Sequence, residues 1–68
     1  MIKLGKHIHF KGKQYEVIGF AKHSETLEEM VIYKQLYGNH ETWVRPVSMW
    51  EEEVNRDDYC GPRFRPID

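Results

Sequence analysis

The chain has 68 residues, with ten Lys or Arg against eleven Asp or Glu, a formal charge of −1 and a single cysteine. Its length allows one domain with a small core, because a domain of about 60 residues buries only about 60% of the surface that its unfolded chain exposes. The near-neutral charge excludes nucleic-acid binding through overall electrostatic attraction, and the lone Cys60 excludes an intramolecular disulfide.

The chain carries no obvious targeting signal. Its first six residues, Met1 to Lys6, contain no long apolar run and no small-residue cleavage pattern, so no signal peptide is expected. No apolar stretch approaches the roughly 20 residues that a membrane helix needs. Together with the lone cysteine, which fits a reducing compartment, this predicts a soluble, cytoplasmic protein without membrane partners.

Short extended segments dominate the first half. Alternation predicts a strand over residues 7–10, and Gly12 between two lysines predicts a tight hairpin turn. A second strand is expected over 14–22, with Gly19 easing a bend. Strand periodicity divides its side chains between two faces. We expect one face to carry Tyr15, Val17, Gly19 and Ala21, and the other Ile18 and Phe20.

The next segments alternate between polar connections and strands. Residues 23–29 predict a loop, although Ser24 would also suit the start of a helical turn. Residues 30–37 are rich in β-branched and aromatic side chains and predict a strand. A turn over 38–41 and a strand over 42–47 follow.

The last third is less regular. Pro46 cannot donate a ladder hydrogen bond, so the strand over 42–47 is at an edge there, or ends or bulges there. Residues 48–54 suit either one helical turn, with Ser48 capping and Glu51 three residues later, or an extended segment. We expect a loop over 55–62 and a short strand over 63–67.

The whole chain, residues 1–68, is therefore expected to form one all-β domain of about five short antiparallel strands, with at most one helical turn. A closed or nearly closed small barrel is favoured because closure removes exposed sheet edges. A monomer and a homodimer are both compatible with so small a core.

Several short motifs appear in an order and spacing that resemble a known family, the domain of unknown function 1653. They are His9-Phe10-Lys11-Gly12, Ala21-Lys22-His23-Ser24-Glu25-Thr26, Tyr33-Lys34-Gln35-Leu36-Tyr37-Gly38, Trp43-Val44-Arg45-Pro46, Met49-Trp50 and Pro62-Arg63-Phe64. The resemblance implies a compact SH3-like β-roll or barrel of bacterial origin. It implies no activity, substrate or cofactor, so no catalytic residue is carried over. His40-Glu41 departs from the family pattern, which is richer in glycine at this turn.

A polar run, His23-Ser24-Glu25-Thr26, contains residue types that serve nucleophilic catalysis. Neighbouring residues of a strand point to opposite faces, and no glycine elbow surrounds Ser24. We therefore interpret the run as a hydrogen-bonded loop, with His23, Ser24 and Glu25 as candidate ligand contacts.

Two histidines share strand parity. His7 and His9, with His23 or His40, could in principle bind a metal. Zinc sites need three or four ligands, and neither a Cys pair nor an HExxH spacing accompanies these residues. We interpret His7 and His9 as partly exposed strand residues and expect no metal and no cofactor.

Aromatic residues supply the remaining candidates. Most of the five, Tyr15, Tyr33, Tyr37, Trp43 and Trp50, are expected in the core. Tyr33 and Tyr37 share one strand parity, as do Trp43 and Arg45. Tyr, Trp and Arg are the residues that anchor binding hot spots, so Tyr33, Tyr37, Trp43 and Arg45 form the favoured interaction face.

These features favour a noncatalytic binding or accessory module for a protein, peptide or small ligand. The alternative is a nucleotide- or RNA-binding accessory domain, for which Arg63-Phe64-Arg65 could supply stacking and phosphate contacts. A small hydrolase or metal-dependent enzyme ranks below both.

Overall fold

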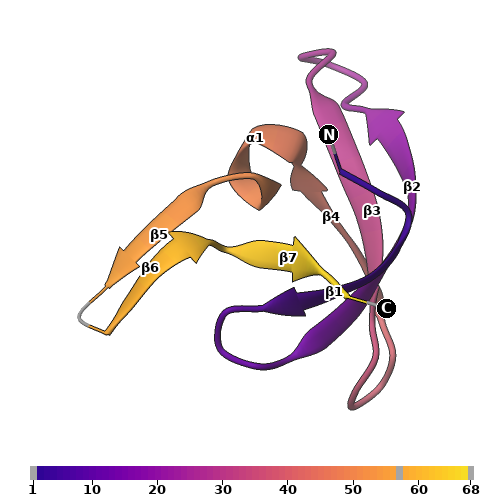
Figure 1. Ribbon diagram of the computed structural model, residues 1–68. Helices are drawn as coiled ribbons and strands as arrows, with labels where there is room; N and C mark the ends of the chain where they lie inside the picture. Colours follow the sequence, from indigo (N-terminus) through magenta and orange to yellow (C-terminus); the bar gives the residue numbers. More distant parts are fainter. Residues whose placement is uncertain (1, 57, 68) are drawn as a thin grey trace.

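A computed structural model describes residues 2–56 and 58–67 of the chain (Figure 1). Antiparallel strands make up most of it, with one short helix. The elements in chain order are β1 (Gly5–His9), β2 (Gln14–Lys22), β3 (Glu29–Gln35), β4 (Thr42–Pro46), α1 (Val47–Trp50), β5 (Glu53–Arg56), β6 (Tyr59–Pro62) and β7 (Phe64–Pro66). The predicted all-β class is confirmed.

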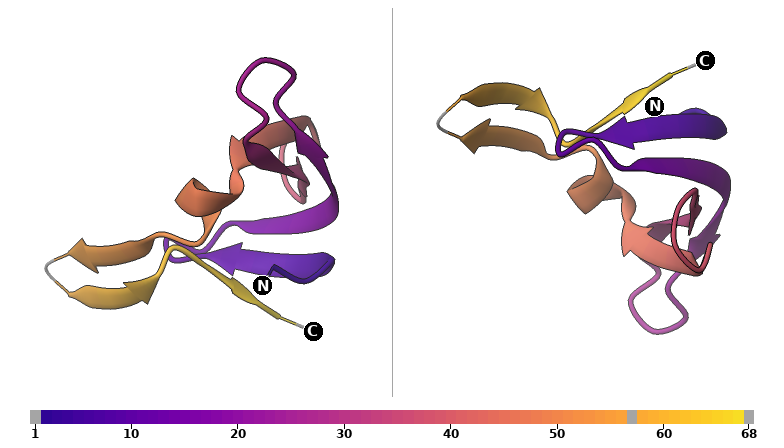
Figure 2. Two further views of the ribbon diagram at one scale, coloured as in Figure 1. Left: turned by 90° about the horizontal axis from the view of Figure 1, so that it is seen from above. Right: turned by 90° about the horizontal axis from the view of Figure 1, so that it is seen from below.

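Five strands form one curled sheet in the order β4-β3-β2-β1-β7, and β5 pairs with β6 in a separate hairpin. This hairpin projects from the sheet as an arm (Figure 2). In the described part of the chain β4 and β7 do not pair with each other, so the sheet is an open roll and not a closed barrel. The SH3-like description stays a prediction.

The turn between β1 and β2 depends on glycine. Gly12 has φ +103°, a conformation that L side chains rarely adopt. Its N–H donates to the carbonyl of His9 at 2.7 Å, while the N–H of His9 donates to the carbonyl of Lys13 at 2.8 Å. The predicted hairpin turn is therefore confirmed.

A β-bulge in β2 overturns the predicted division of its side chains. Val17 lies opposite Tyr33, but Gly19 lies opposite Ile32, so Ile18 is an extra residue without a partner of its own. Phe20 consequently lies opposite Val31. Directly opposed residues of an antiparallel pair share a face, so Phe20 shares the inner face with Val17 and not the outer face with Ile18.

The core lies on this inner face, between the sheet and α1. Its buried members are Val17, Val31, Tyr33, Trp50 and Phe64. Helix α1 spans four residues and buries one side chain, Trp50, which is 3% exposed. Covering the sheet is therefore the main structural contribution of the helix.

The region after β4 departs from prediction in two ways. Residues 48–54 divide between the end of α1 and the start of β5, and the N-cap is Pro46 without a side-chain cap hydrogen bond, so the Ser48 cap was wrong. Residues 55–62, predicted as loop, belong to the β5–β6 hairpin apart from its turn; Asp57 lies outside the described residues. Val54, which is buried with 6% of its surface exposed, was the one apolar residue in the sequence that could have indicated strand β5.

The turn between β3 and β4 contains His40-Glu41, where the family pattern is richer in glycine. His40 adopts φ 54° and Gly38 adopts φ 57°. Histidine tolerates this left-handed region better than most non-glycine residues. The N–H of His40 donates to the carbonyl of Tyr37 at 3.1 Å, so the chain still reverses where glycine was expected.

No helix in the described residues has the length and apolar character to cross a membrane.

Candidate ligand-binding surface

Two predicted site residues, Trp43 and Arg45, lie on the inner face at the free edge of the sheet. Trp43 lies opposite the buried Tyr33, and Arg45 lies opposite the fully buried Val31. Opposed residues share a face, so both side chains of β4 extend the core outward to the rim. Alternation along strand β4 had predicted that these two residues share a face, and this is confirmed.

Arg45 is positioned by an aromatic ring of the core. Its guanidinium carbon lies 5.5 Å from the centroid of Phe64, within the range of a cation–π interaction. The Phe64 ring is itself held by face-to-face stacking on Trp50. Arg45 is therefore a half-buried cation at a defined position on the rim.

Trp43 is held in place but remains accessible. Its indole N–H donates a hydrogen bond to the side-chain oxygen of Gln35, whose amide nitrogen donates to the carbonyl of Tyr37 at 3.3 Å. Trp43 as a whole is nevertheless 48% exposed. A fixed, accessible ring loses little entropy on binding, which is what a contact residue requires.

Tyr37 joins the same surface through Tyr15. Their hydroxyls share a hydrogen bond of 2.8 Å, and the Lys13 ammonium lies 4.5 Å from the Tyr37 ring centroid. Burial raises the pKa of Tyr15, and the hydrogen bond with Tyr37 raises it further. Gln35 thus links Trp43 to Tyr37 at one end of the inner face. Arg45 lies two residues along β4 toward the β2–β3 loop, and Tyr33 lies in the core.

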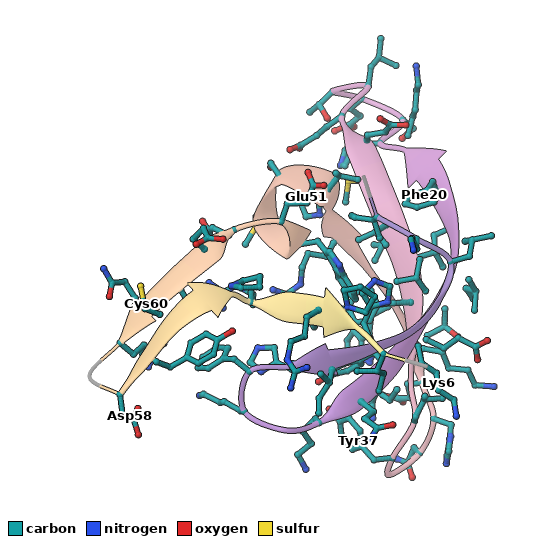
Figure 3. All side chains as sticks on the ribbon, viewed as in Figure 1. Lys6, Phe20, Tyr37, Glu51, Asp58 and Cys60 are labelled. Carbon is teal, nitrogen blue, oxygen red and sulfur yellow. The ribbon has the colours of Figure 1, made fainter. Side chains whose placement is uncertain are left out.

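The loop that carries His23, Ser24 and Glu25 lies at the other end of the β2–β3 hairpin. It forms the turn at the top of Figure 1, whereas Tyr37 is labelled near the bottom of Figure 3. The structure does not bring these three residues to the aromatic group. Any ligand role for them would be separate from that of Trp43 and Arg45.

Histidine 23 organises this loop through its ring. The His23 Nδ1 accepts the N–H of Glu25 at 3.1 Å and that of Thr26 at 3.4 Å. The Thr26 hydroxyl accepts the N–H of Glu28 at 3.2 Å. These bonds satisfy loop backbone groups, and they leave His23 Nδ1 occupied rather than available to activate Ser24.

The two histidines predicted to share a strand face, His7 and His9, differ in burial. His7 is 3% exposed, with its Nδ1 3.2 Å from the carbonyl oxygen of Gly5 and its ring edge-on to Trp50, so its prediction as a partly exposed residue was wrong. His9 is half-buried. Among the described residues no group of three His, Cys, Asp or Glu side chains is arranged to hold a metal ion.

Sequence reasoning missed a second cluster, where the β1–β2 turn meets the β5–β6 arm. Phe10 stacks on Tyr59 with ring centroids 5.2 Å apart, and the cations of Lys11 and Arg56 lie 5.9 and 5.8 Å from the Phe10 centroid. The only local signal was the succession His-Phe-Lys at the turn. Phe64, proposed for stacking with Arg63 and Arg65, is instead a buried core residue.

A pocket of about 440 Å³ lies toward the β2–β3 loop and is lined by Ile2, Phe20, Glu29, Val47 and Glu51. The bulge in β2 creates it, because only the shifted register turns Phe20 inward. Phe20 and Glu51 are both labelled in the upper half of Figure 3, and Tyr37 is labelled near the bottom. This pocket is therefore distinct from the aromatic surface on β4.

Together, the fold and its surface define a small all-β domain that presents aromatic and cationic side chains along the β4 edge of a curled sheet. The family model for DUF1653, described as a protein of unknown function, matches residues 5–66. The chain belongs to this family.

A solved structure supports the assignment. It is the crystal structure of a protein belonging to DUF1653 from Bordetella bronchiseptica, 31% identical to this chain with a TM-score of 0.88. The similarity covers 97% of this chain and 87% of that one. No functionally curated protein matches the chain.

Proposed function

We propose that this protein is a noncatalytic binding module that captures an extended segment of a partner protein along the free edge of β4. The proposal rests on one observation: β4 is an edge strand, and it carries Trp43 and Arg45 on its inner face. An exposed edge strand is a template for an added strand, which obtains affinity from main-chain hydrogen bonds and specificity from flanking side chains.

The hydrogen-bond pattern identifies which groups of β4 are available. The N–H of Gln35 donates to the carbonyl of Glu41 at 2.9 Å, one residue beyond the paired region. Bonded and non-bonded pairs alternate along an antiparallel ladder, so the peptide groups of Thr42, Val44 and Pro46 face away from β3. Because Pro46 has no N–H, the edge offers the donors of Thr42 and Val44.

The flanking side chains suggest what the segment would carry. Trp43 and Arg45 flank an added strand on the inner face, and Val44, 59% exposed, flanks it on the outer face. Side chains of an added strand alternate between the same two faces. An acidic residue beside Arg45 and an apolar residue beside Trp43 would complement this edge.

The opposite edge is less suited to the same role. At β7, the N–H of Phe10 donates to the carbonyl of Arg63, and the N–H of Ile67 donates to the carbonyl of Lys6. The backbone peptide groups of Phe64 and Pro66 therefore face away from β1. Pro66 lacks a donor and Phe64 is buried. Of the two edges, β4 therefore presents more donors and the more accessible aromatic side chain.

Selection from a displayed library of random peptides tests the proposal. We expect enriched peptides with one acidic residue and alternating apolar residues, and their binding should shift the amide NMR signals of Thr42 and Val44. Val44→Pro removes an outward donor and should weaken binding by about tenfold or more, equivalent to about 1.4 kcal/mol. Val44→Thr keeps the donor and is the matched control. Failure to enrich any peptide, or equal binding by a folded Val44→Pro variant, would refute the proposal.

A further inference from the structure

A series of ring contacts runs from the β5–β6 arm to the β3–β4 turn, from Phe10 through His9, Phe64 and Tyr15 to Tyr37, and cations lie beside it. We call it the ring-and-cation strip, and it comprises Arg56, Phe10, Lys11, His9, Arg63, Arg45, Tyr37 and Lys13. It begins at the arm, where Lys11 and Arg56 both lie against Phe10. The stacking of Phe10 on Tyr59 fixes this end of the strip to β6.

The middle of the strip gathers positive charge around His9. The His9 ring lies 4.5 Å from Phe10 and 5.0 Å from Phe64, between centroids. Burial lowers its pKa, and the positive charges of Arg63, Arg45 and Lys11 lower it further. Three cations from three different segments therefore lie within electrostatic reach of one ring.

Arg63 has donor capacity left over. One terminal nitrogen donates to the Glu52 carboxylate at 2.9 Å, which neutralises part of the local charge. Its Nε is buried and, among the described residues, has no hydrogen-bond partner. The accessible quarter of the Arg63 side chain, and not this buried N–H, is what an anionic ligand can meet.

The strip ends at Tyr37, where Lys13 lies 4.5 Å from the ring centroid. The half-exposed Trp43 lies beside it, linked through Gln35. Five of the ten Lys and Arg residues thus lie along the strip, although the whole chain has a charge of −1. The net charge conceals this local concentration.

We propose that the ring-and-cation strip binds single-stranded nucleic acid. Spaced cations can follow a phosphate backbone, and accessible rings such as Trp43 and Tyr37 can stack with unpaired bases. An acidic peptide would use the cations but would leave the rings without planar partners. This activity goes beyond the peptide binding proposed for β4. The two share Trp43 and Arg45, but nucleic-acid binding does not need the edge donors of Thr42 and Val44.

Fluorescence anisotropy with labelled oligouridylate and oligothymidylate of about ten nucleotides tests the proposal. We expect binding at low salt that weakens as salt rises, with a slope of log affinity against log salt near −0.7 for each phosphate neutralised. Lys11→Gln and Arg56→Gln should each weaken binding about three- to tenfold and make the slope shallower by about 0.7. Lys6→Gln removes the same charge from the opposite sheet face and is the matched control.

Competition by other ligands distinguishes nucleic-acid binding from binding of small anions or acidic peptides. Inorganic phosphate, uridine monophosphate and an oligoglutamate of about ten residues, matched to the oligonucleotide in length, should compete at least tenfold less well than the oligonucleotide. Binding should also raise the pKa of His9, because phosphates offset the three neighbouring cations. Equal competition by oligoglutamate, equal losses in Lys6→Gln and Lys11→Gln, or no binding at low salt would each overturn the proposal. The Val44→Pro variant should bind the oligonucleotide normally, so the two proposals can fail separately.

Discussion

Trp50 lies face to face on Phe64, with ring planes within 4° of parallel and centroids 3.7 Å apart. This contact joins the short helix α1 to β7 and closes one side of the core. Replacing a buried Trp by Ala typically costs about 3–5 kcal/mol, and a core of this size rarely supplies more than about 3–5 kcal/mol in total. We therefore expect Trp50→Ala to be largely unfolded in circular dichroism and urea titrations.

The neighbouring Met49 provides the control for that experiment. It lies in the same helix but is 46% exposed. Met49→Ala should change the free energy of unfolding by no more than about 0.5 kcal/mol. Equal stability of Trp50→Ala and the unchanged protein would show that α1 does not close the core.

Substitution by Ala is expected to have opposite effects on stability at Gly12 and at Gly19. Gly12 has φ +103°, so Gly12→Ala should destabilise the β1–β2 turn by more than about 1 kcal/mol. Gly19 has no positive φ, and a Cβ there would meet no atom within 4 Å. Gly19→Ala should be neutral or stabilise by up to about 1 kcal/mol. Thermal unfolding of the two variants measures the difference, and a loss of equal size in both would contradict the assigned conformations.

His9 should titrate below its ordinary pKa of 6.5, chiefly because of burial and then because of Arg63, Arg45 and Lys11. In the unfolded chain His9 regains the ordinary value, so below pH 6.5 the unfolded state takes up a proton before the native state does. Its contribution to stability is thus complete above that pH and declines as pH falls. An NMR titration of the ring should show the lowered pKa, and Lys11→Gln should raise it. A native value at or above 6.5 would argue against the cation cluster.

The Tyr15–Tyr37 pair should make the protein sensitive to alkali. The raised pKa of Tyr15 means that the unfolded state loses this phenolic proton first as pH rises past the ordinary value of 10.0. Stability should therefore fall above that pH. Tyr37→Phe removes the partner of the Tyr15 hydroxyl, and should cost about 1 kcal/mol and reduce the pKa shift seen by ultraviolet titration. If Tyr37→Phe left both quantities unchanged, the hydroxyl–hydroxyl bond would not form in solution.

The β2–β3 loop should depend on an acceptor at position 23. His23→Ala removes the ring nitrogen that accepts from the N–H groups of Glu25 and Thr26. We expect faster amide hydrogen exchange at those two residues, with little change in global stability, because the loop is exposed. His23→Asn can accept locally and should restore slower exchange. Unchanged exchange in His23→Ala would rule out the ring as the organising group.

Much of the fold was predictable because local patterns and tertiary packing agree. Strands β1 to β4 appear close to their predicted positions, and the Gly12 turn has the conformation that its residue types favour. The β5–β6 arm was missed because its strands carry few apolar residues; Val54 is its one buried hydrophobic side chain. Strand periodicity gives little signal in a hairpin that packs so little of itself into a core.

The surface on β4 was predictable in part. Alternation along one strand was enough to place Trp43 and Arg45 on one face. The position of His23 relative to them was not predictable, because it depends on which end of a hairpin each residue occupies and on the order of the strands. The cluster at Phe10 depends on contact between segments far apart in the chain, here Lys11 and Arg56.

By itself, the amino-acid sequence determined the strand-rich class, the family and an interruption of strand pairing at Pro46, which could mean an edge, an end or a bulge. These properties follow from local residue types and from motifs in order. Tertiary structure alone decided that a bulge at Ile18 turns Phe20 inward, and that cations from separate segments gather around His9. Both depend on register and on pairing between distant segments, and no local pattern specifies either.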